Sequence, residues 1–220
     1  IVYNTGHLFG FFSIFNSGAS KNFSLIQGGR PAQYGGRLSS VLDIAMKEGN
    51  MKRWEVEGGI GAIASRISVQ GPLKKDKASF IISARRTYVD MLVKPFIKKS
   101  SNYHGSGYYF YDLNMKANYK FSDKDRLYLS GYFGRDVFDF RSAQRAFSAN
   151  IPWGNSTATL RWNHVFNRKL FANTTLVYND YKFSFGAAQN DFRLKLSSGI
   201  RDWNAKLDFE DFRAGDKFNI

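Results

Sequence analysis

The side chains that could carry out bond chemistry are scattered along the chain. General acid–base reactions such as glycoside hydrolysis need two carboxylates held close together, but the candidate carboxylates fall on separate predicted elements: Asp43, Asp90, Asp112 and Asp136. The histidines form no pair with metal-ligand spacing, although a site assembled in space from all three stays open: His7, His104 and His164. Cysteine is absent, which excludes a thiolate metal site and a disulfide framework. The sequence therefore predicts no enzyme, no catalytic residue, no metal site and no cofactor.

The net charge of +14 and the aromatic content of 17% raise a second possibility, a nucleic-acid-binding protein. Proteins that bind single strands place basic and aromatic side chains on one face, so that bases stack beside neutralised phosphates. Here the aromatic and charged residues mostly alternate along the chain, and alternate residues of a strand point to opposite faces. We therefore expect no nucleic-acid partner.

A strand of unusual length is predicted at residues 109–121. Its odd positions are aromatic or aliphatic and its even positions are polar, with Phe110 as the single exception. The distance from Tyr111 to Tyr119 is about 26 Å at about 3.3 Å per residue, or about 20 Å after a tilt of about 40°. The apolar band of a transmembrane β-barrel is about 25 Å tall. Aromatic residues at both ends of this strand and aliphatic residues in its middle also fit a membrane.

The same alternation predicts roughly eight strands from residue 53 onward, with no useful helical periodicity. Short charged turns are predicted at 74–77, 122–125, 167–169 and 213–217, and longer loops at 87–108, 136–155 and 184–198. A change of parity at residues 201–202 predicts a β-bulge or a short turn there. Short turns on one side and long loops on the other are typical of a transmembrane β-barrel. The alternative is a soluble β-sandwich or barrel, whose strands usually run to about five or six residues.

The barrel interpretation assigns the two faces of the strands to lipid and to the barrel lumen. The residues predicted to face lipid are Trp54, Leu113, Met115, Leu129, Leu160 and Leu207. The residues predicted to face the lumen are Glu55, Asn114, Lys116, Ser130 and Arg161. The chain is therefore predicted to be an all-β integral membrane protein that crosses the bilayer many times.

Residues 1–52 differ in pattern from the barrel strands predicted at 53–220. An extended segment at 23–26 is followed by a glycine-punctuated stretch and then by a second extended segment at 38–46. The glycine pairs suit tight turns or close approach of the backbone. The stretch contains Gly28, Gly29, Arg30, Pro31, Tyr34, Gly35, Gly36 and Arg37. We predict that these residues shape a separate domain.

This order of strand, Gly-Gly-Arg-Pro turn, Tyr-Gly-Gly step and second strand resembles the end of the plug domain of TonB-dependent outer-membrane receptors, in wording nearest to those of Bacteroidetes-type bacteria. Residues 71–88 resemble the first periplasmic turn and third strand of that family, but the plug motif departs from that of the glycan-importing SusC-like branch. The resemblance implies that residues 1–52 are the C-terminal part of a plug. It also implies that residues 53–220 are roughly the first eight strands of a 22-stranded barrel, so the chain is expected to be an excerpt of a longer protein.

The resemblance implies active uptake of a scarce, large solute, such as a siderophore, cofactor, peptide or oligosaccharide, across the bacterial outer membrane. The implied partners are TonB, through a segment expected to lie outside this chain, and lipopolysaccharide with outer-membrane lipid; a surface lipoprotein is a further candidate. A passive porin or structural barrel is the alternative. It would share the strands but not the glycine-punctuated stretch.

Two sets of charged residues are predicted to make contacts: one set between the plug and the barrel, and one set near the outer rim of the barrel. Ion pairs between plug and barrel are expected among Arg30, Arg37, Glu55 and Glu57. Basic residues near the outer rim are predicted to meet lipopolysaccharide phosphates or an anionic solute: Arg85, Arg86, Lys98 and Lys99.

Overall fold

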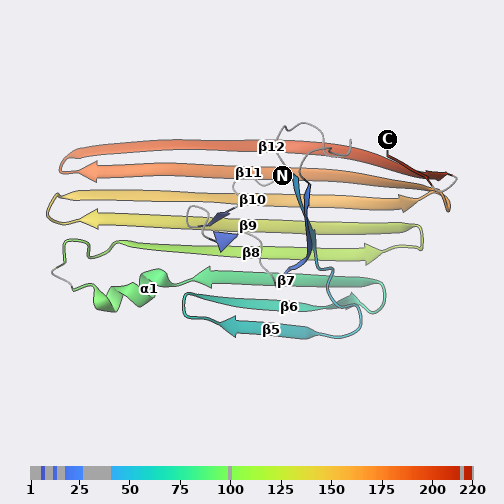
Figure 1. Cartoon of the computed structure of the whole chain (residues 1–220), viewed down its shortest axis with the longest axis horizontal. Coiled ribbons are helices and arrows are strands. Elements are labelled where there is room, and N and C mark those ends of the chain that lie inside the picture. Colours follow the sequence, from blue (N-terminus) through green and yellow to red (C-terminus); the bar gives the residue numbers. More distant parts are fainter. Residues whose placement is uncertain are drawn as a thin grey trace.

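The chain forms one large antiparallel sheet with a small N-terminal segment lying across it (Figure 1). The computed structural model describes residues 6–7, 12–13, 18–26, 41–98, 101–213 and 216–219. Within these ranges the sheet has nine strands in the order β13-β12-β11-β10-β9-β8-β7-β6-β5. Strands that are adjacent in sequence are therefore adjacent in the sheet, and each connection is an antiparallel hairpin. The predicted all-β fold is confirmed.

The strands of the sheet become longer from β5, with six residues, to β12, with 22, except that β7 is one residue shorter than β6; the last strand, β13, has four residues. Their bounds are β5 (Glu55–Ile60), β6 (Ala64–Lys74), β7 (Ala78–Thr87), β8 (Gly107–Lys120), β9 (Asp125–Ser142), β10 (Phe147–Val165), β11 (Leu170–Gln189), β12 (Phe192–Arg213) and β13 (Asp216–Asn219). Most strands in proteins run to about five or six residues. The long strands that the alternation predicts are confirmed from β8 to β12.

The end of the sheet at the right of Figure 1 carries tight polar turns, as predicted. In the turn between β8 and β9, the Ser122 hydroxyl accepts hydrogen bonds from the backbone N–H groups of Lys124 and Asp125. In the turn between β10 and β11, the Asn167 side chain accepts hydrogen bonds from the N–H groups of Lys169 and Leu170. Such side chains replace the backbone partners that a turn leaves unpaired. We call this end the turn end and the opposite end the loop end.

Two of the three loops predicted at the loop end are wrong. Most of 136–155 and 184–198 is strand, and the connections that separate β9 from β10 and β11 from β12 are tight turns. Ala146 and Asn190, with φ of 44° and 51°, adopt the left-handed conformation in these turns. The predicted loop at 87–108 does contain a longer connection, with the short helix α1 (Val89–Val93) and the 3-10 turn η3 (Lys94–Phe96), which the periodicity did not predict.

The β-bulge or turn predicted at residues 201–202 is also wrong. β11 and β12 pair in one continuous register from Leu170 opposite Asp211 to Gln189 opposite Phe192. The parity of the apolar residues changes because the apolar side chains move to the other face of an unbroken strand. The large sheet does shift register elsewhere, between Pro72 and Lys74, where β6 pairs with β7.

The two faces of the sheet are built differently. We call the face that the N-terminal segment covers the inward face, and the other the outward face. One outward row crosses eight strands without a charged side chain: Val56, Val69, Ile82, Met115, Gly131, Ala158, Tyr178 and Trp203. The next row is equally apolar: Phe80, Ala117, Leu129, Leu160, Leu176 and Ala205.

The register confirms the predicted division of residues between faces. Outward residues include Leu113, Met115, Leu129, Leu160 and Leu207, and the Trp54 ring contacts that of outward Phe80 with centroids 5.2 Å apart. Glu55, Lys116 and Ser130 lie in one row of cross-strand neighbours on the inward face. Gln70 and Ile81 connect Glu55 to Lys116 in that row. Asn114 and Arg161 lie on the same inward face. Which face meets lipid is a separate question that the register alone does not answer.

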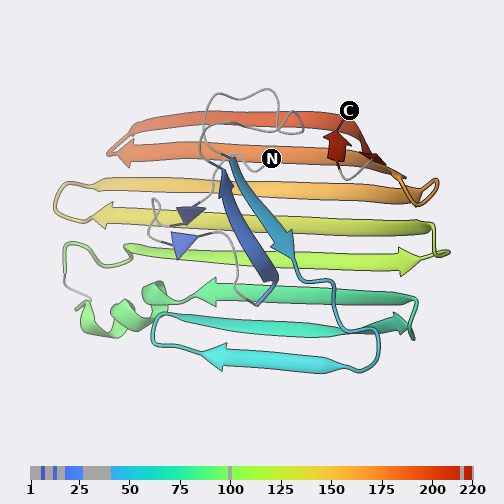
Figure 2. The same ribbon diagram turned by 45° about the vertical axis from the view of Figure 1, so that its right-hand side comes forward.

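The N-terminal segment lies against the inward face (Figure 2). It contains two antiparallel strand pairs, β1 (Gly6–His7) with β2 (Phe12–Ser13), and β3 (Ser20–Ile26) with β4 (Val41–Met46). The extended segments predicted at 23–26 and 38–46 are confirmed over β3 and β4. The glycine-punctuated stretch lies outside the described residues: Gly28, Gly29, Arg30, Pro31, Tyr34, Gly35, Gly36 and Arg37.

Candidate functional site

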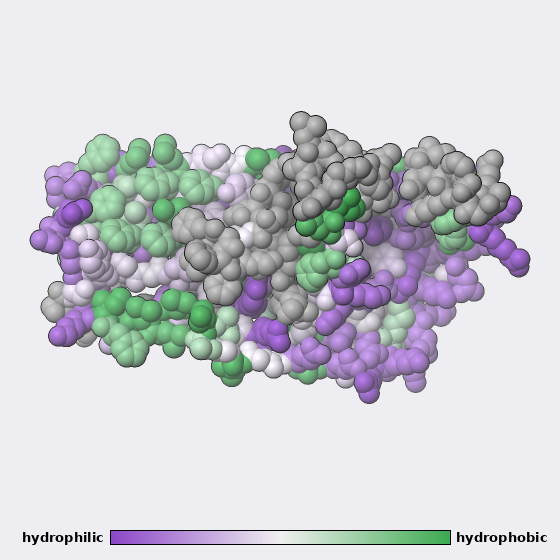
Figure 3. All heavy atoms as spheres, viewed as in Figure 1, coloured by the Kyte–Doolittle hydropathy of each residue, from purple (hydrophilic) through white to green (hydrophobic). Residues whose placement is uncertain are grey.

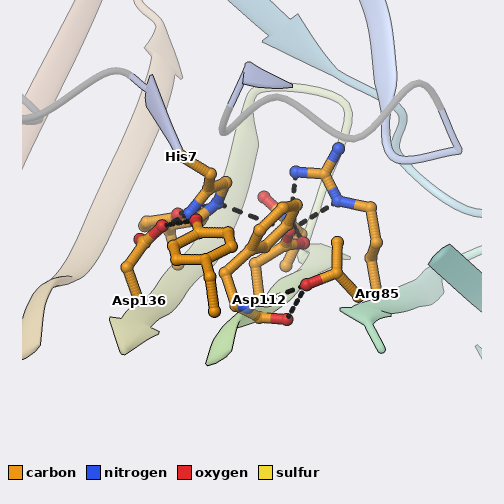
Figure 4. Close-up of polar contacts among 9 residues, drawn as sticks. His7, Arg85, Asp112 and Asp136 are labelled. Atoms are coloured by element: carbon orange, nitrogen blue, oxygen red, sulfur yellow. Dashed lines mark hydrogen bonds and ion pairs between the residues drawn. The ribbon is translucent and has the colours of Figure 1, made fainter. Parts of the chain in front are cut away.

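Two groups of polar contacts connect the N-terminal segment to the inward face. We call the first the His7 cluster, formed by His7, Arg85, Asp112 and Asp136 (Figure 4). We call the second the Glu48 junction, formed where the chain leaves β4 and passes to the sheet. Both groups bring together residues that are far apart in sequence.

The His7 cluster joins β1 to three strands of the sheet. His7 Nδ1 lies 2.7 Å from Asp136 Oδ2 in β9, and His7 Nε2 lies 3.6 Å from Asp112 Oδ2 in β8. Arg85 in β7 places Nη2 and Nε 2.6 and 2.7 Å from the same Asp112 oxygen. Arg85 and Asp112 are direct cross-strand neighbours, an arrangement that favours opposite charges. The imidazole therefore faces both carboxylates, and one of them is already paired with a guanidinium.

The Phe110 ring packs against two members of the cluster. The His7 ring stacks on the Phe110 ring with centroids 4.0 Å apart and planes within 3°, and the Arg85 guanidinium lies 5.0 Å above the same ring. Phe110 is completely buried, and its N–H donates to Thr87 Oγ1 at 2.8 Å. This contact explains the one error in the alternation of residues 109–121, since Phe110 occupies an inward position in order to carry the cluster.

Three members of the cluster are withdrawn from water. His7, Asp112 and Asp136 are each 2% exposed, and the Tyr108 hydroxyl donates a hydrogen bond to the second oxygen of Asp136. A buried charge that loses its partner costs several kcal/mol, about 3–5 in measured cases. We therefore expect that the loss of any one partner weakens the attachment of the N-terminal segment. Sequence analysis placed Asp112 and Asp136 on separate elements and missed that His7 connects them.

The Glu48 junction relies largely on main-chain oxygens. The Glu48 carbonyl accepts hydrogen bonds from Ser79 Oγ at 2.7 Å and Asn118 Nδ2 at 2.9 Å. Lys116 Nζ donates to the Met46 carbonyl at 3.2 Å. The Glu48 carboxylate adds an ion pair with Arg126 Nη2 at 2.8 Å. Sequence analysis assigned Lys116 to this face correctly but did not identify Glu48 as its neighbour.

Gly49 fixes the path of the chain at this junction. Its φ of +82° lies in the left-handed region, which favours glycine, and a Cβ at this position would lie 2.3 Å from the Phe80 carbonyl oxygen. The chain therefore turns away from β4 in close contact with β7. Gly49 was a signal in the sequence that could have marked the junction.

The predicted ion pairs between plug and barrel stay a prediction. Arg30 and Arg37 lie outside the described residues, and Glu57 is exposed on β5. The Glu55 carboxylate accepts hydrogen bonds from Asn50, Arg53 and Gln70, each at 2.8 Å. It therefore has partners in the segment that leads into the sheet and in β6.

The predicted rim cations divide between the two faces. Arg85 is inward and pairs with Asp112, so its prediction as a rim residue is wrong; the strand alternation should have separated it from Arg86. Arg86 lies on the outward face, with its guanidinium 5.5 Å from the Tyr109 ring centroid. Lys98 is exposed, and Lys99 lies outside the described residues.

Toward the loop end the inward face becomes apolar. Tyr108, Phe110 and Trp153 form a buried group, against which Phe138, Ile151 and Phe183 pack. Figure 3 shows hydrophobic residues gathered over the loop ends of β10 to β12, in the same view as Figure 1. The exposed members of this surface on β12 are Phe192, Leu194, Leu196 and Ile200. The inward face thus changes from charged to apolar at the His7 cluster.

The described residues contain no group of three or more histidine, aspartate or glutamate side chains arranged to hold a metal ion. None of the helices in the described ranges is long and apolar enough to cross a bilayer. The close polar contacts of the His7 cluster and the Glu48 junction suit the holding of one segment against another. Comparison of the chain with protein families, with curated proteins and with solved structures finds no match.

Proposed function

We propose that the chain is part of a transmembrane β-barrel with the C-terminal part of a plug, and that it serves TonB-dependent active uptake of a scarce, large solute across the bacterial outer membrane. The observation that carries this proposal is the contrast between the two faces. An N-terminal segment is bound by buried polar contacts to the inward face of a sheet whose outward face is a continuous apolar band.

The outward face supports placement in a membrane. Its large apolar side chains are exposed, with Trp203 at 67% as an example. Soluble proteins rarely expose contiguous apolar patches larger than a few hundred Å². Along β8 the outward apolar side chains lie between Tyr119 and Tyr111, eight residues apart, or about 26 Å at about 3.3 Å per residue. On β11 and β12 the band is shorter and ends at Tyr178 and Trp203, because the next outward row contains the ion pair of Asp180 and Arg201. Lipid-facing bands of outer-membrane barrels are about 25 Å tall and end in aromatic residues.

The inward face supports the presence of a plug. A segment that fills a polar lumen must satisfy the polar groups of the wall, because buried groups without partners are costly. The His7 cluster and the Glu48 junction meet this requirement at two separate places. TonB pulling on the chain upstream of His7 would act first on the His7 cluster. A passive porin has no need of such an attachment.

Uptake measured with and without TonB tests the proposal. We expect the full-length protein to support growth on one of a panel of scarce solutes, comprising iron-loaded siderophores, cofactors, peptides and oligosaccharides. Deletion of TonB should abolish that growth. Growth that is unchanged without TonB, together with steady ion conduction in planar bilayers, would instead establish a passive porin.

A reversible cross-link between β1 and β9 tests the role of the plug separately. The His7 and Asp136 side chains meet at their ends, 2.7 Å apart, and the shorter cysteine side chains would not reach each other, since a disulfide needs Cβ atoms about 3.5–4.5 Å apart. Cysteines at both positions, joined by a short bis-methanethiosulfonate reagent, should fix the N-terminal segment to the sheet wall. Uptake should then be lost in the cross-linked double variant and return with a reductant, whereas neither single cysteine variant should respond to the reductant. Full uptake by the cross-linked double variant would mean that this contact need not open during transport.

A further inference from the structure

Two neighbouring rows of the inward face near the loop end contain only uncharged side chains, most of them apolar. One row contains Tyr108, Phe138, Ile151, Phe185 and Leu196. The next row toward the loop end contains Phe140, Ala149, Ala187 and Leu194. We call them the inward apolar rows. Within the described strands β8 to β12, no inward position from these rows to the loop end has a charged side chain.

The other side of the same part of the sheet is polar. The outward row between the two inward apolar rows contains Asp139, Asn150 and Lys195. This polarity is the reverse of that in the apolar band, and a face with charged side chains is not suited to lipid. On β11 the second row, at Ala187, lies nine residues beyond Tyr178, which is about 30 Å at about 3.3 Å per residue. The inward apolar rows therefore lie beyond the lipid-facing band, on the side of the loop end.

The inward apolar rows are open on β12 and continuous with the attachment of the N-terminal segment. Leu196 is 57% exposed and Leu194 is 40% exposed. Contiguous exposed apolar surface of this kind marks a place where a ligand or partner binds. On β8 the same surface adjoins the His7 cluster, because the Tyr108 hydroxyl donates a hydrogen bond to Asp136. A ligand on these rows would therefore lie directly beside the contact that holds the N-terminal segment.

We propose that the inward apolar rows bind an uncharged apolar group of the transported solute, such as the macrocycle of a cofactor or the aliphatic and aromatic side chains of a peptide. The inference rests on the proposed function and names the chemical class of its solute. The rows offer a large apolar contact area with few hydrogen-bonding groups, which is typical of sites for apolar ligands. An oligosaccharide or a polar siderophore would lose hydrogen bonds to water at these rows without replacing them, which is unfavourable.

The extent of the surface indicates a large apolar group. From Tyr108 on β8 to Leu196 on β12 the first row crosses four spacings between strands, which is about 19 Å at about 4.8 Å per spacing. Along β12 the apolar inward side chains continue from Leu196 to Phe192, a further distance of about 13 Å. This area exceeds that of one side chain. It suits a macrocycle, or several side chains of one peptide.

Ligand binding to the full-length protein in lipid nanodiscs tests this proposal, because detergent would itself occupy an apolar site. The apolar probes are a capped hexapeptide of leucine, phenylalanine and serine, and a zinc porphyrin whose carboxylates are esterified with short ethylene glycol chains. The polar probes are a capped hexapeptide of serine and asparagine, and a linear glucose hexasaccharide. After subtraction of binding to empty nanodiscs, we expect at least one apolar probe to bind at least about tenfold more tightly than both polar probes. The tighter of the two apolar probes distinguishes a peptide from a macrocyclic solute.

Substitutions on β12 locate the site. Leu194→Asn combined with Leu196→Asn should weaken binding of the apolar probe by at least about tenfold, because two apolar contacts are lost. Lys195→Gln is the matched control, since Lys195 lies between the two leucines in sequence but on the outward face, and it should bind as the wild type does. In a separate measurement that leaves both asparagines out, Leu196→Cys should react with a small water-soluble thiol reagent, and the apolar probe should protect it.

Four results would overturn the proposal. They are polar probes that bind as tightly as the apolar ones, no binding of either apolar probe, equal loss of binding in Lys195→Gln, and a Leu196→Cys variant that the bound probe does not protect. The dependence of uptake on TonB is measured separately. Uptake of a polar solute that depends on TonB, with no binding of the apolar probes, would remove this inference and leave the proposed function. Binding of the apolar probes, with uptake unchanged in the absence of TonB, would remove the proposed function and leave the apolar site.

Discussion

The His7 cluster and the Glu48 junction hold the same segment to the same face by different means. The His7 cluster consists of side chains that each depend on a specific partner; His7, Asp112 and Asp136 are nearly removed from water, and Arg85 is 16% exposed. The Glu48 junction consists mainly of main-chain carbonyls, with a carboxylate that is still 39% exposed. A main-chain contact survives most substitutions, whereas a buried ion pair fails when one member is removed. The His7 cluster is therefore the attachment that a single event can open.

The largest effect is expected from Arg85→Gln. It leaves Asp112 buried without its guanidinium, a change that costs about 3–5 kcal/mol for buried ion pairs. We expect faster hydrogen exchange of the β1 amides in the full-length protein, which reports release of the segment. Arg86→Gln is the matched control, because Arg86 is the next residue and lies on the outward face. Similar effects of the two variants would contradict the importance of the cluster.

His7→Ala is expected to have the next largest effect. It removes a hydrogen bond to a charged group, about 1.5–3 kcal/mol, and a stacked ring contact, about 0.5–1.5 kcal/mol. His7→Phe keeps the stacking on Phe110 but removes the hydrogen bond to Asp136. Exchange of the β1 amides should be fastest in the alanine variant and intermediate in the phenylalanine variant. Wild-type exchange in both would show that the segment is held elsewhere.

Gly49→Ala tests the main-chain character of the other attachment. The added methyl group must avoid the Phe80 carbonyl, and the residue must keep a positive φ, which costs about 1–3 kcal/mol for a residue other than glycine. We expect a lower midpoint of urea-induced release of β3 and β4, with β1 still attached through His7. Gly58→Ala is a suitable control, since its Cβ would meet the nearest atom at 3.9 Å. Simultaneous release of β1 would show that the two attachments are not independent.

Glu48→Gln should have a small effect. The partly exposed ion pair with Arg126 contributes about 0–1 kcal/mol by comparison with other exposed pairs, and the carbonyl contacts with Ser79 and Asn118 are kept. The same urea experiment should give a midpoint close to that of the wild type. A shift as large as that of Gly49→Ala would show that the carboxylate, rather than the main chain, holds the junction.

The sequence predicted the parts of this fold that follow from local periodicity. Alternation placed Leu129 and Lys116 on the correct faces, and polar residues such as Ser122 and Asn167 marked the tight turns. The loop end was predicted poorly, because the apolar side chains of β12 lie on the inward face up to Ile200 and on the outward face from Trp203, without a break in register. The change of face was therefore interpreted as a loop at 184–198 and as a bulge or turn at 201–202.

The candidate site was harder to predict than the strands. His7 and Asp136 are separated by 129 residues, and no periodic pattern connects two residues across that distance. Phe110 was the one available sign of the His7 cluster, as an apolar residue on a polar face. Its exception to the pattern marked the place where the N-terminal segment binds, but it did not identify His7 as the residue that binds there.

The smallest effect is expected from the pH dependence of the turn between β8 and β9. A hydrogen bond from Lys120, together with its charge, lowers the pKa of Asp123, and the two groups lie 2.5 Å apart. A lowered pKa in the folded state stabilises the turn above the unfolded pKa of about 3.9, and this contribution is lost as the pH falls through the folded value. Asp123 is 94% exposed, so salt screens the pair and the effect is small. Protection of the turn amides, measured relative to their intrinsic exchange rate at each pH, should fall below about pH 4 in the wild type but not in Asp123→Asn. An equal fall in both would assign the pH dependence to another group.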